Sequence, residues 1–111
     1  MDVARIEQMK GGWFVGDFEP TLHRTAEVEV AIKEYRAGDF EPEHHHKVAT
    51  ELTAIVRGEA EMGGRRLVAG DVAVLAPGEP ASFLARTDVV LVAVKLPSVS
   101  GDKYEGRGGG G

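Results

Sequence analysis

The chain has 111 residues, a formal net charge of -5 and no cysteine. This length fits one domain with a modest hydrophobic core. The negative charge argues against a general nucleic-acid binder, and the lack of cysteine excludes disulfides, thiolate chemistry and Cys-based zinc sites. Because there is no apolar run of 18 residues and no apolar core of a signal peptide near residue 1, we expect a cytoplasmic protein that contacts no membrane.

Residues 1–23 are predicted to form an N-terminal extension. Asp2 is a candidate cap for a short helix over residues 3–10, which the glycine pair at 11–12 would end. The stretch WFVGDFEP that follows contains three aromatic side chains. Such a cluster is expected to pack on the core as a lid or an added strand.

From residue 27 onward the pattern is one of strands and turns. EVEVAIKEY alternates apolar and polar residues with a period of two, and ELTAIVRG, DVAVLA and VVLVAVKLP read as further strands. Gly63-Gly64 predicts a hairpin, and the Arg86-Thr87-Asp88 turn predicts a second one. Short strands punctuated by glycine favour an antiparallel all-β sandwich or small barrel. The glycine-rich stretch within 99–111 is predicted to be a flexible tail.

Residues 41–51, EPEHHHKVATE, contain three of the four histidines and end on a glutamate. One interpretation is an exposed polar loop. Strand geometry favours another, because His44 and His46 would project to the same face, about 6.6 Å apart along the chain, with His45 on the opposite face. If the chain turns back after His46, Glu51 lies beside both imidazoles. Two neutral nitrogens and one carboxylate form the facial arrangement typical of non-haem iron, with positions open for substrate or oxygen.

The wider spacing resembles the first signature motif of the cupins. Five residues separate Gly38 from His44, one separates His44 from His46, four separate His46 from Glu51, and six separate Glu51 from Gly58. The resemblance implies that the two histidines and the glutamate are ligands of a divalent metal, which would be iron, manganese, nickel or zinc. It also implies the antiparallel double-stranded β-helix, or jelly roll, of the cupin barrel.

The second cupin motif is incomplete. It usually has a glycine-aspartate turn, a proline-glycine turn and then a histidine that supplies the fourth ligand. Both turns are present, at Gly70-Asp71 and Pro77-Gly78, but Ala81 stands at the histidine position. Three alternatives follow: water fills the gap in a weaker site, His23 substitutes, or the histidines act without metal as acid or base groups. The alanine would also open space for a substrate.

Strand parity extends the predicted pocket. If Glu51 points inward, Arg57 does too, and it could hold a carboxylate or phosphate at the barrel mouth. The alternative is a surface arginine at the end of a strand. Phe83 shares the parity of Ala81 and is expected in the core or the pocket wall.

Two predicted strands, at residues 51–58 and 89–97, are apolar on both faces. A strand that is apolar on both faces is normally covered on both faces. In a small one-domain protein a second copy is the simplest cover, and the cupin resemblance implies the same. We therefore expect a homodimer built by sheet packing.

These observations predict three parts: the N-terminal extension, a cupin β-barrel at residues 24–98 and the tail. The protein would act on a small organic molecule through its metal, either as a dioxygenase or in the redox-neutral chemistry of an isomerase, epimerase or lyase. Because one ligand is missing, the alternative is a cupin that binds a small molecule, for example a sugar or metabolite, without turnover.

Overall fold

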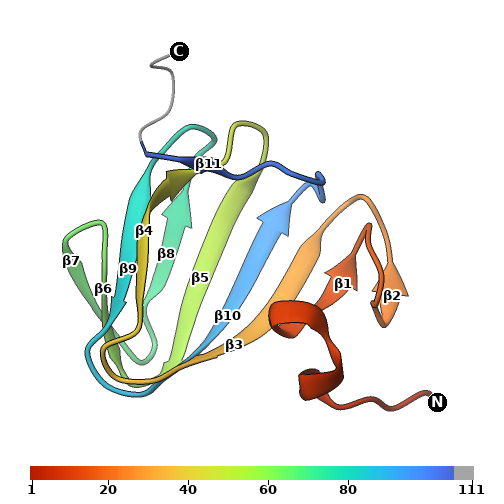
Figure 1. The fold of residues 1–111 in the computed structure, drawn as a ribbon, viewed down its shortest axis with the longest axis horizontal. Coiled ribbons are helices and arrows are strands. Elements are labelled where there is room, and N and C mark those ends of the chain that lie inside the picture. Colours follow the sequence, from red (N-terminus) through yellow and green to blue (C-terminus); the bar gives the residue numbers. More distant parts are fainter. Residues whose placement is uncertain (107–111) are drawn as a thin grey trace.

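The computed structural model describes residues 1–106 as two facing β-sheets with the N-terminal segment beside one of them (Figure 1). One sheet has the strand order β2-β1-β3-β10-β5-β8, and the other has the order β11-β4-β9-β6-β7. All strand pairs are antiparallel except β1 with β2. The strands are β1 (Trp13–Gly16), β2 (His23–Arg24), β3 (Glu29–Tyr35), β4 (Phe40–His45), β5 (Thr50–Arg57), β6 (Glu59–Met62), β7 (Arg65–Val68), β8 (Val72–Leu75), β9 (Ala81–Ala85), β10 (Val89–Leu96) and β11 (Tyr104–Glu105).

From β3 onward the chain passes back and forth between the two sheets. β3, β5, β8 and β10 belong to the first sheet, and β4, β6, β7, β9 and β11 belong to the second. This alternation defines a double-stranded β-helix, so the predicted all-β jelly roll is confirmed. Among residues 1–106, no helix is long and apolar enough to cross a bilayer.

One of the two predicted hairpins forms. Gly63 and Gly64 connect β6 to β7 with φ angles of 57° and 80°, and Met62 pairs with Arg65. The Arg86-Thr87-Asp88 hairpin is wrong, because β9 pairs with β4 and β6 while β10 pairs with β3 and β5. This segment is instead an arch between the sheets. Its sequence looks like a hairpin because both connections need only a short polar turn between two alternating strands.

Gly58 shows why the last position of the first motif suits glycine. It has a φ of 94°, which favours glycine, and a Cβ at this position would lie 2.1 Å from the carbonyl oxygen of Asp88. The arch from β5 to β6 therefore passes directly against the arch from β9 to β10. A side chain at this position would force the two connections apart.

The ends of the chain differ from the sequence predictions. In place of a helix over 3–10, two 3-10 turns form at Ile6–Gln8 and Lys10–Gly12, and the second contains a positive φ at Gly11. The predicted flexible tail is also corrected, because Asp102 is 6% exposed and β11 pairs with β4. Residues 107–111 of that tail lie outside the described part of the chain.

The hydrophobic core fills the end of the barrel away from the histidines. Its buried members come from both sheets and include several alanines, which let the sheets approach closely. They are Ala31, Ile55, Ala60, Phe83, Ala85, Val89, Leu91 and Ala93. The opposite, outward side of the first sheet is also apolar. Its paired rows are Val30, Val94, Leu52 and Val74, then Ile32, Val92, Ala54 and Val72.

Candidate metal centre

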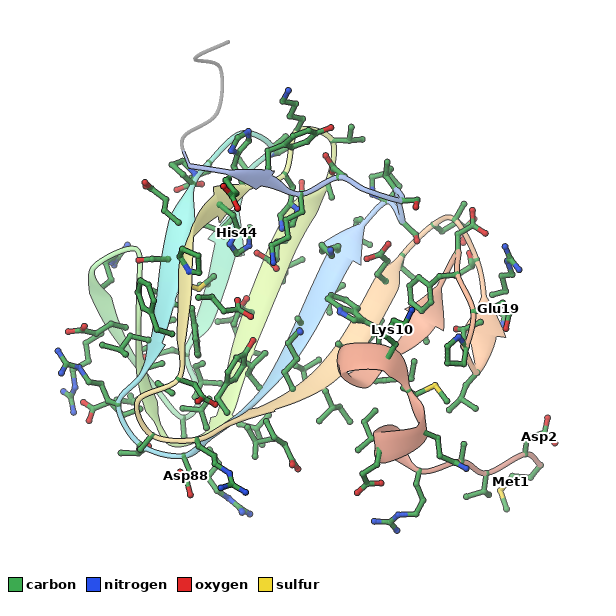
Figure 2. The ribbon with its side chains drawn as sticks, viewed as in Figure 1. Met1, Asp2, Lys10, Glu19, His44 and Asp88 are labelled. Carbon is green, nitrogen blue, oxygen red and sulfur yellow. The ribbon has the colours of Figure 1, made fainter. Side chains whose placement is uncertain are left out.

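A β-bulge in β4 directs His44 into the barrel. Glu41 pairs with Phe83 on β9, and His44 pairs with Ala81, so β4 has one residue more than β9 between these two pairs. Pro42 lies in this bulge, where the absence of its N–H removes no ladder hydrogen bond. Figure 2 shows His44 at the end of the barrel opposite Asp88.

Three side chains meet at this end of the barrel. One ligand atom from each of His44, His46 and Glu51 lies within 4.8 Å of the others. His46 Nε2 is 3.8 Å from Glu51 Oε2, and the two imidazole rings are nearly perpendicular, with centroids 5.4 Å apart. The structure thus brings together the three residues that the first motif predicted. His45 points the other way, as expected, and its ring stacks on Tyr104.

The hydrogen bonds of the two imidazoles leave the same nitrogen free on each ring. His44 Nδ1 contacts the carbonyl oxygen of Pro42 at 3.2 Å, and His46 Nδ1 contacts the carbonyl oxygen of Asp102. A carbonyl accepts only from N–H, so both rings carry the proton on Nδ1 and present an unprotonated Nε2 when neutral. His46 Nε2 is buried without a hydrogen-bond partner. A buried, unpaired nitrogen beside a carboxylate fits a metal ion, because coordination would satisfy it.

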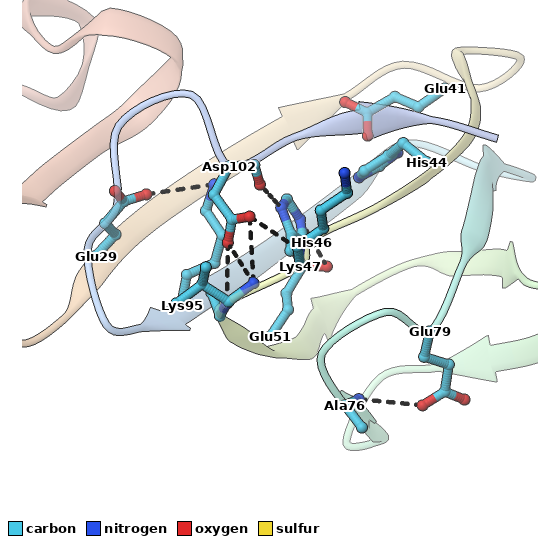
Figure 3. A network of polar contacts seen from close by, with 12 residues as sticks. Glu29, Glu41, His44, His46, Lys47, Glu51, Ala76, Glu79, Lys95 and Asp102 are labelled. Atoms are coloured by element: carbon cyan, nitrogen blue, oxygen red, sulfur yellow. Dashed lines mark hydrogen bonds and ion pairs between the residues drawn. The ribbon is translucent and has the colours of Figure 1, made fainter. Parts of the chain in front are cut away.

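Asp102 holds the loop that contains His46, and the sequence reasoning missed it. Its carboxylate accepts hydrogen bonds from the backbone N–H groups of Lys47, Val48 and Ala49 at 2.8–3.2 Å (Figure 3). Its carbonyl oxygen binds His46, so one residue fixes both the turn and the ring. An aspartate before a glycine-rich end gave no local signal of this contact, because its partners lie more than 50 residues away.

Nearby charge and burial shift the pKa values of the three side chains in opposite directions. Burial lowers the pKa of His44. The carboxylate of Glu51, which lies beside the Nε2 atom of His46, raises the pKa of His46. Burial alone would raise the pKa of Glu51, but His46, His44 and Lys95 together outweigh it, so this pKa is lowered. The carboxylate is therefore kept ionised, which is the form that binds a cation.

The other predicted pocket residues are distributed differently. Ala81 is buried directly across the β4–β9 ladder from His44, as its place in the second motif requires. Phe83 lies in the core, where its ring is 4.7 Å from that of Tyr35. Arg57 is exposed and shares a cavity with Asp88 at the opposite end of the barrel. A register shift between Val90 and Leu91 interrupts the parity on which its inward orientation was predicted.

Two cavities are lined by neighbours of the three-residue group, although His44, His46 and Glu51 line neither of them. One has a volume of about 500 Å³ and reaches Ala81 and Leu75, the strand partners of His44 and Glu51. The other has a volume of about 280 Å³ and reaches Lys95 and Asp102, neighbours of Glu51 and His46. His23 is exposed on β2 and is not part of the group.

Similar architectures occur among solved protein structures. No protein-family model and no curated protein matches the sequence. Among solved structures, an uncharacterized protein with a double-stranded β-helix domain from Klebsiella pneumoniae is 23% identical with a TM-score of 0.69, and the match covers 75% of this chain and 73% of that one. An RmlC-like cupin from Shewanella frigidimarina is 20% identical with a TM-score of 0.63, over 68% of this chain and 71% of that one.

A third similar structure is a larger protein. DMSP lyase DddQ from Ruegeria pomeroyi is 21% identical with a TM-score of 0.72, and the match covers 84% of this chain but 49% of that one. At these identities the likeness establishes the fold. The chain therefore has the double-stranded β-helix fold of these structures, with His44, His46 and Glu51 grouped inside it.

Proposed function

We propose that this protein is a small metal-dependent cupin that acts on a small organic molecule through a divalent ion held by His44, His46 and Glu51. The observation that carries the proposal is the convergence of the three ligand atoms within 4.8 Å, with His46 Nε2 buried and unpaired. The resemblance to a lyase of the same fold supports an enzyme, and the two cavities lined by strand neighbours of the group support a small substrate.

The protein's own residues would prepare the site in three ways. The carbonyl oxygens of Pro42 and Asp102 orient the two rings, Glu51 supplies the negative charge, and the barrel wall excludes bulk water. When bound, the ion would supply Lewis-acid polarisation for an isomerase, epimerase or lyase, or oxygen chemistry for a dioxygenase. Ala81 leaves the fourth ligand position free of imidazole, so that side of the centre is open to water or substrate.

A second candidate function follows from the same alanine. A cupin with three ligands could bind a small molecule without turning it over. This alternative predicts ligand binding with no product, whereas the enzyme predicts product formation that depends on the ion.

The test is metal analysis of untagged protein, combined with thermal unfolding after addition of iron, manganese, nickel or zinc. We expect the wild-type protein to retain metal and to unfold at a higher temperature with its preferred ion. His46→Ala should lose both effects. His23→Ala is the matched control, because it removes an exposed imidazole outside the group.

His46 also contacts Asp102, so its loss could disturb the fold itself. His44→Ala is the second variant, because its ring contacts only the local Pro42 carbonyl through Nδ1. Equal, near-zero metal in the wild-type protein and in both variants would contradict the proposal. Oxygen consumption with candidate substrates would then separate the dioxygenase from the redox-neutral reactions.

A further inference from the structure

The inward face of the first sheet carries a row of charged side chains that includes a residue of the metal group. Lys95 on β10 pairs with Glu29 on β3 and with Glu51 on β5, so it lies between two carboxylates (Figure 3). Directly paired side chains on neighbouring strands have Cβ atoms about 4.5–5.5 Å apart. Lys95 is thus an immediate neighbour of the proposed centre, on the side where its charge lowers the pKa of Glu51.

Lys95 retains hydrogen-bonding capacity. Its Nζ is 3.3 Å from Glu29 Oε1, and the other oxygen of Glu29 accepts the Ser98 hydroxyl at 2.7 Å. Both members of the ion pair are largely buried, with side chains 18% and 10% exposed. An ammonium has three donors, so one ion pair leaves capacity for a second anion.

A second lysine shares the same aromatic neighbour. The Nζ atoms of Lys95 and Lys33 lie 4.7 Å and 5.4 Å from the ring centroid of Trp13. Within residues 1–106, Lys33 forms no ion pair, and burial lowers its pKa. The nearest carboxylate that favours its charge, Glu41, already accepts a hydrogen bond from Tyr35 at 3.0 Å. The structure therefore holds a partly desolvated ammonium without a committed partner.

The cavity of about 280 Å³ contains Lys95 in its wall, whereas Lys33 lines a neighbouring cavity with Tyr35 and Glu41. Trp13, Phe18, Glu29 and Lys95 are among the walls of the first cavity, and so is Asp102, which contacts His46. Its volume is at the small end of ligand pockets. Because the positive and negative residues of its wall balance, a monoanion fits better than a dianion such as a phosphate ester. These charged residues are Lys10, Lys95, Lys103, Glu19, Glu29 and Asp102.

We propose that Lys95 binds the carboxylate of a small monocarboxylic acid whose apolar part contacts Trp13 and Phe18, and that Lys33, beside the same Trp13 ring, adds the second positive charge. This inference rests on the proposed function, because the acid would be the molecule presented to the centre at His44, His46 and Glu51. It assigns the substrate class as organic acids and places their recognition on β1, β3 and β10, away from Arg57.

Trp13 is the only tryptophan of the chain, so its fluorescence reports directly on this subsite. The experiment titrates the whole protein with acetate, butanoate, benzoate and phenylacetate, and with the corresponding neutral amides. We expect a saturable change in Trp13 emission with at least one acid and at least tenfold weaker binding of its amide, because only the acid offers charge-assisted hydrogen bonds. Equal responses to the acid and its amide, or no saturable response to any acid, would overturn the proposal.

Substitutions test which residues bind the acid. Lys33→Met should weaken the acid at least tenfold, and Lys95→Arg should retain most of the binding. Arg57→Met is the matched control, because it removes one positive charge at the opposite end of the barrel. A loss in Arg57→Met as large as that in Lys33→Met would show a general charge effect and overturn the assignment. Lys95→Met is paired with Glu29→Gln, so that no buried carboxylate is left alone and folding is preserved.

Two further measurements separate possible failures. Inorganic phosphate that displaces the acid at equal concentration would indicate a generic anion site and overturn the monocarboxylate assignment. Repeating the titration on His46→Ala separates this inference from the metal proposal. An acid that still binds beside Trp13 when neither form of the protein retains metal would leave the subsite in place while the metal proposal fails.

Discussion

The two faces of the first sheet differ at the end of the barrel that holds the metal group. The inward face carries Glu29, Lys95 and Glu51 in one paired row, whereas the outward face carries Val94, Leu52 and their apolar neighbours at alternate positions on the same strands. Buried charges cost free energy unless they are paired or used, and exposed apolar surface is disfavoured unless it is covered. The difference teaches where to look for each property: we predict a ligand site on the charged inward row and a contact with a second copy on the apolar outward face.

The largest effect is expected from a substitution on the inward face, at Glu51. Glu51→Gln removes the only carboxylate of the metal group and should weaken divalent-ion binding by more than roughly a hundredfold, because changes to outer-shell partners alone cost 10–100-fold. Competition with a coloured chelator would measure this. Glu43→Gln is the control, because it removes an exposed charge two residues before His45. Similar losses in both variants would contradict a specific role for Glu51.

One charge at the centre of the outward face should disrupt the predicted dimer. Val92 pairs with Ile32 on one side and Ala54 on the other, and we predict that a second copy covers this surface. Val92→Glu should weaken the dimer roughly a hundredfold, about 2.7 kcal/mol, because it buries an unpaired carboxylate. Sedimentation velocity over a concentration series would measure it.

Ala37→Glu places the same charge on the exposed turn after β3 and should leave the dimer intact. A stable interface of this kind covers about 800 Å² on each copy. A wild-type protein that stays monomeric at all concentrations would remove the predicted homodimer.

The next largest effect is expected at Asp102, which connects the C-terminal segment to the loop that contains His46. Asp102→Ala removes the acceptor of three backbone N–H groups and should weaken metal binding about 10–100-fold through disorder of the loop that holds His46. Asp102→Asn keeps one carbonyl acceptor and should recover part of the loss. Metal affinity and thermal unfolding are measured together. A variant that loses stability with unchanged metal affinity would show that Asp102 supports the fold and not the ligand.

The smallest effect concerns Lys33 and has the opposite sign. Lys33→Met should stabilise the protein slightly near neutral pH, because it removes a partly desolvated ammonium. Burial lowers the folded-state pKa of Lys33, so its charge opposes folding below that pKa and the penalty disappears as pH rises towards the unfolded value of about 10.4. The stability advantage of Lys33→Met should therefore shrink between neutral pH and that value in urea unfolding. An advantage that does not change with pH would contradict this account.

Several features of the fold and the site could be predicted from local patterns in the sequence. The period-two alternation in β3 and the glycine pair at 63–64 indicated a strand and a hairpin that both form. The spacing of His44, His46 and Glu51 indicated a group that does assemble. These predictions were possible because each depends on residues that are close in the chain.

Other features depend on contacts between distant strands. Arg57 is exposed instead of facing inward, because a register shift against β10 changes which side chains face inward at the end of β5. The arch at residues 86–88 and a hairpin need the same turn residues, so only the pairing of β9 and β10 with other strands distinguishes them. The 3-10 turns near residue 10 likewise form where a capping residue and a terminating glycine pair predicted a helix.

The sequence by itself determined that this chain forms a β-rich barrel with two histidines and a glutamate on one motif, because strand periodicity and turn chemistry are properties of neighbouring residues. Only the tertiary structure decided what surrounds that motif. The bulge that aims His44, the return of Asp102 to the metal loop and the approach of Lys33 and Lys95 to Trp13 all depend on the register of strands far apart in the chain. Register is set by the packing of the whole barrel, and no single segment encodes it.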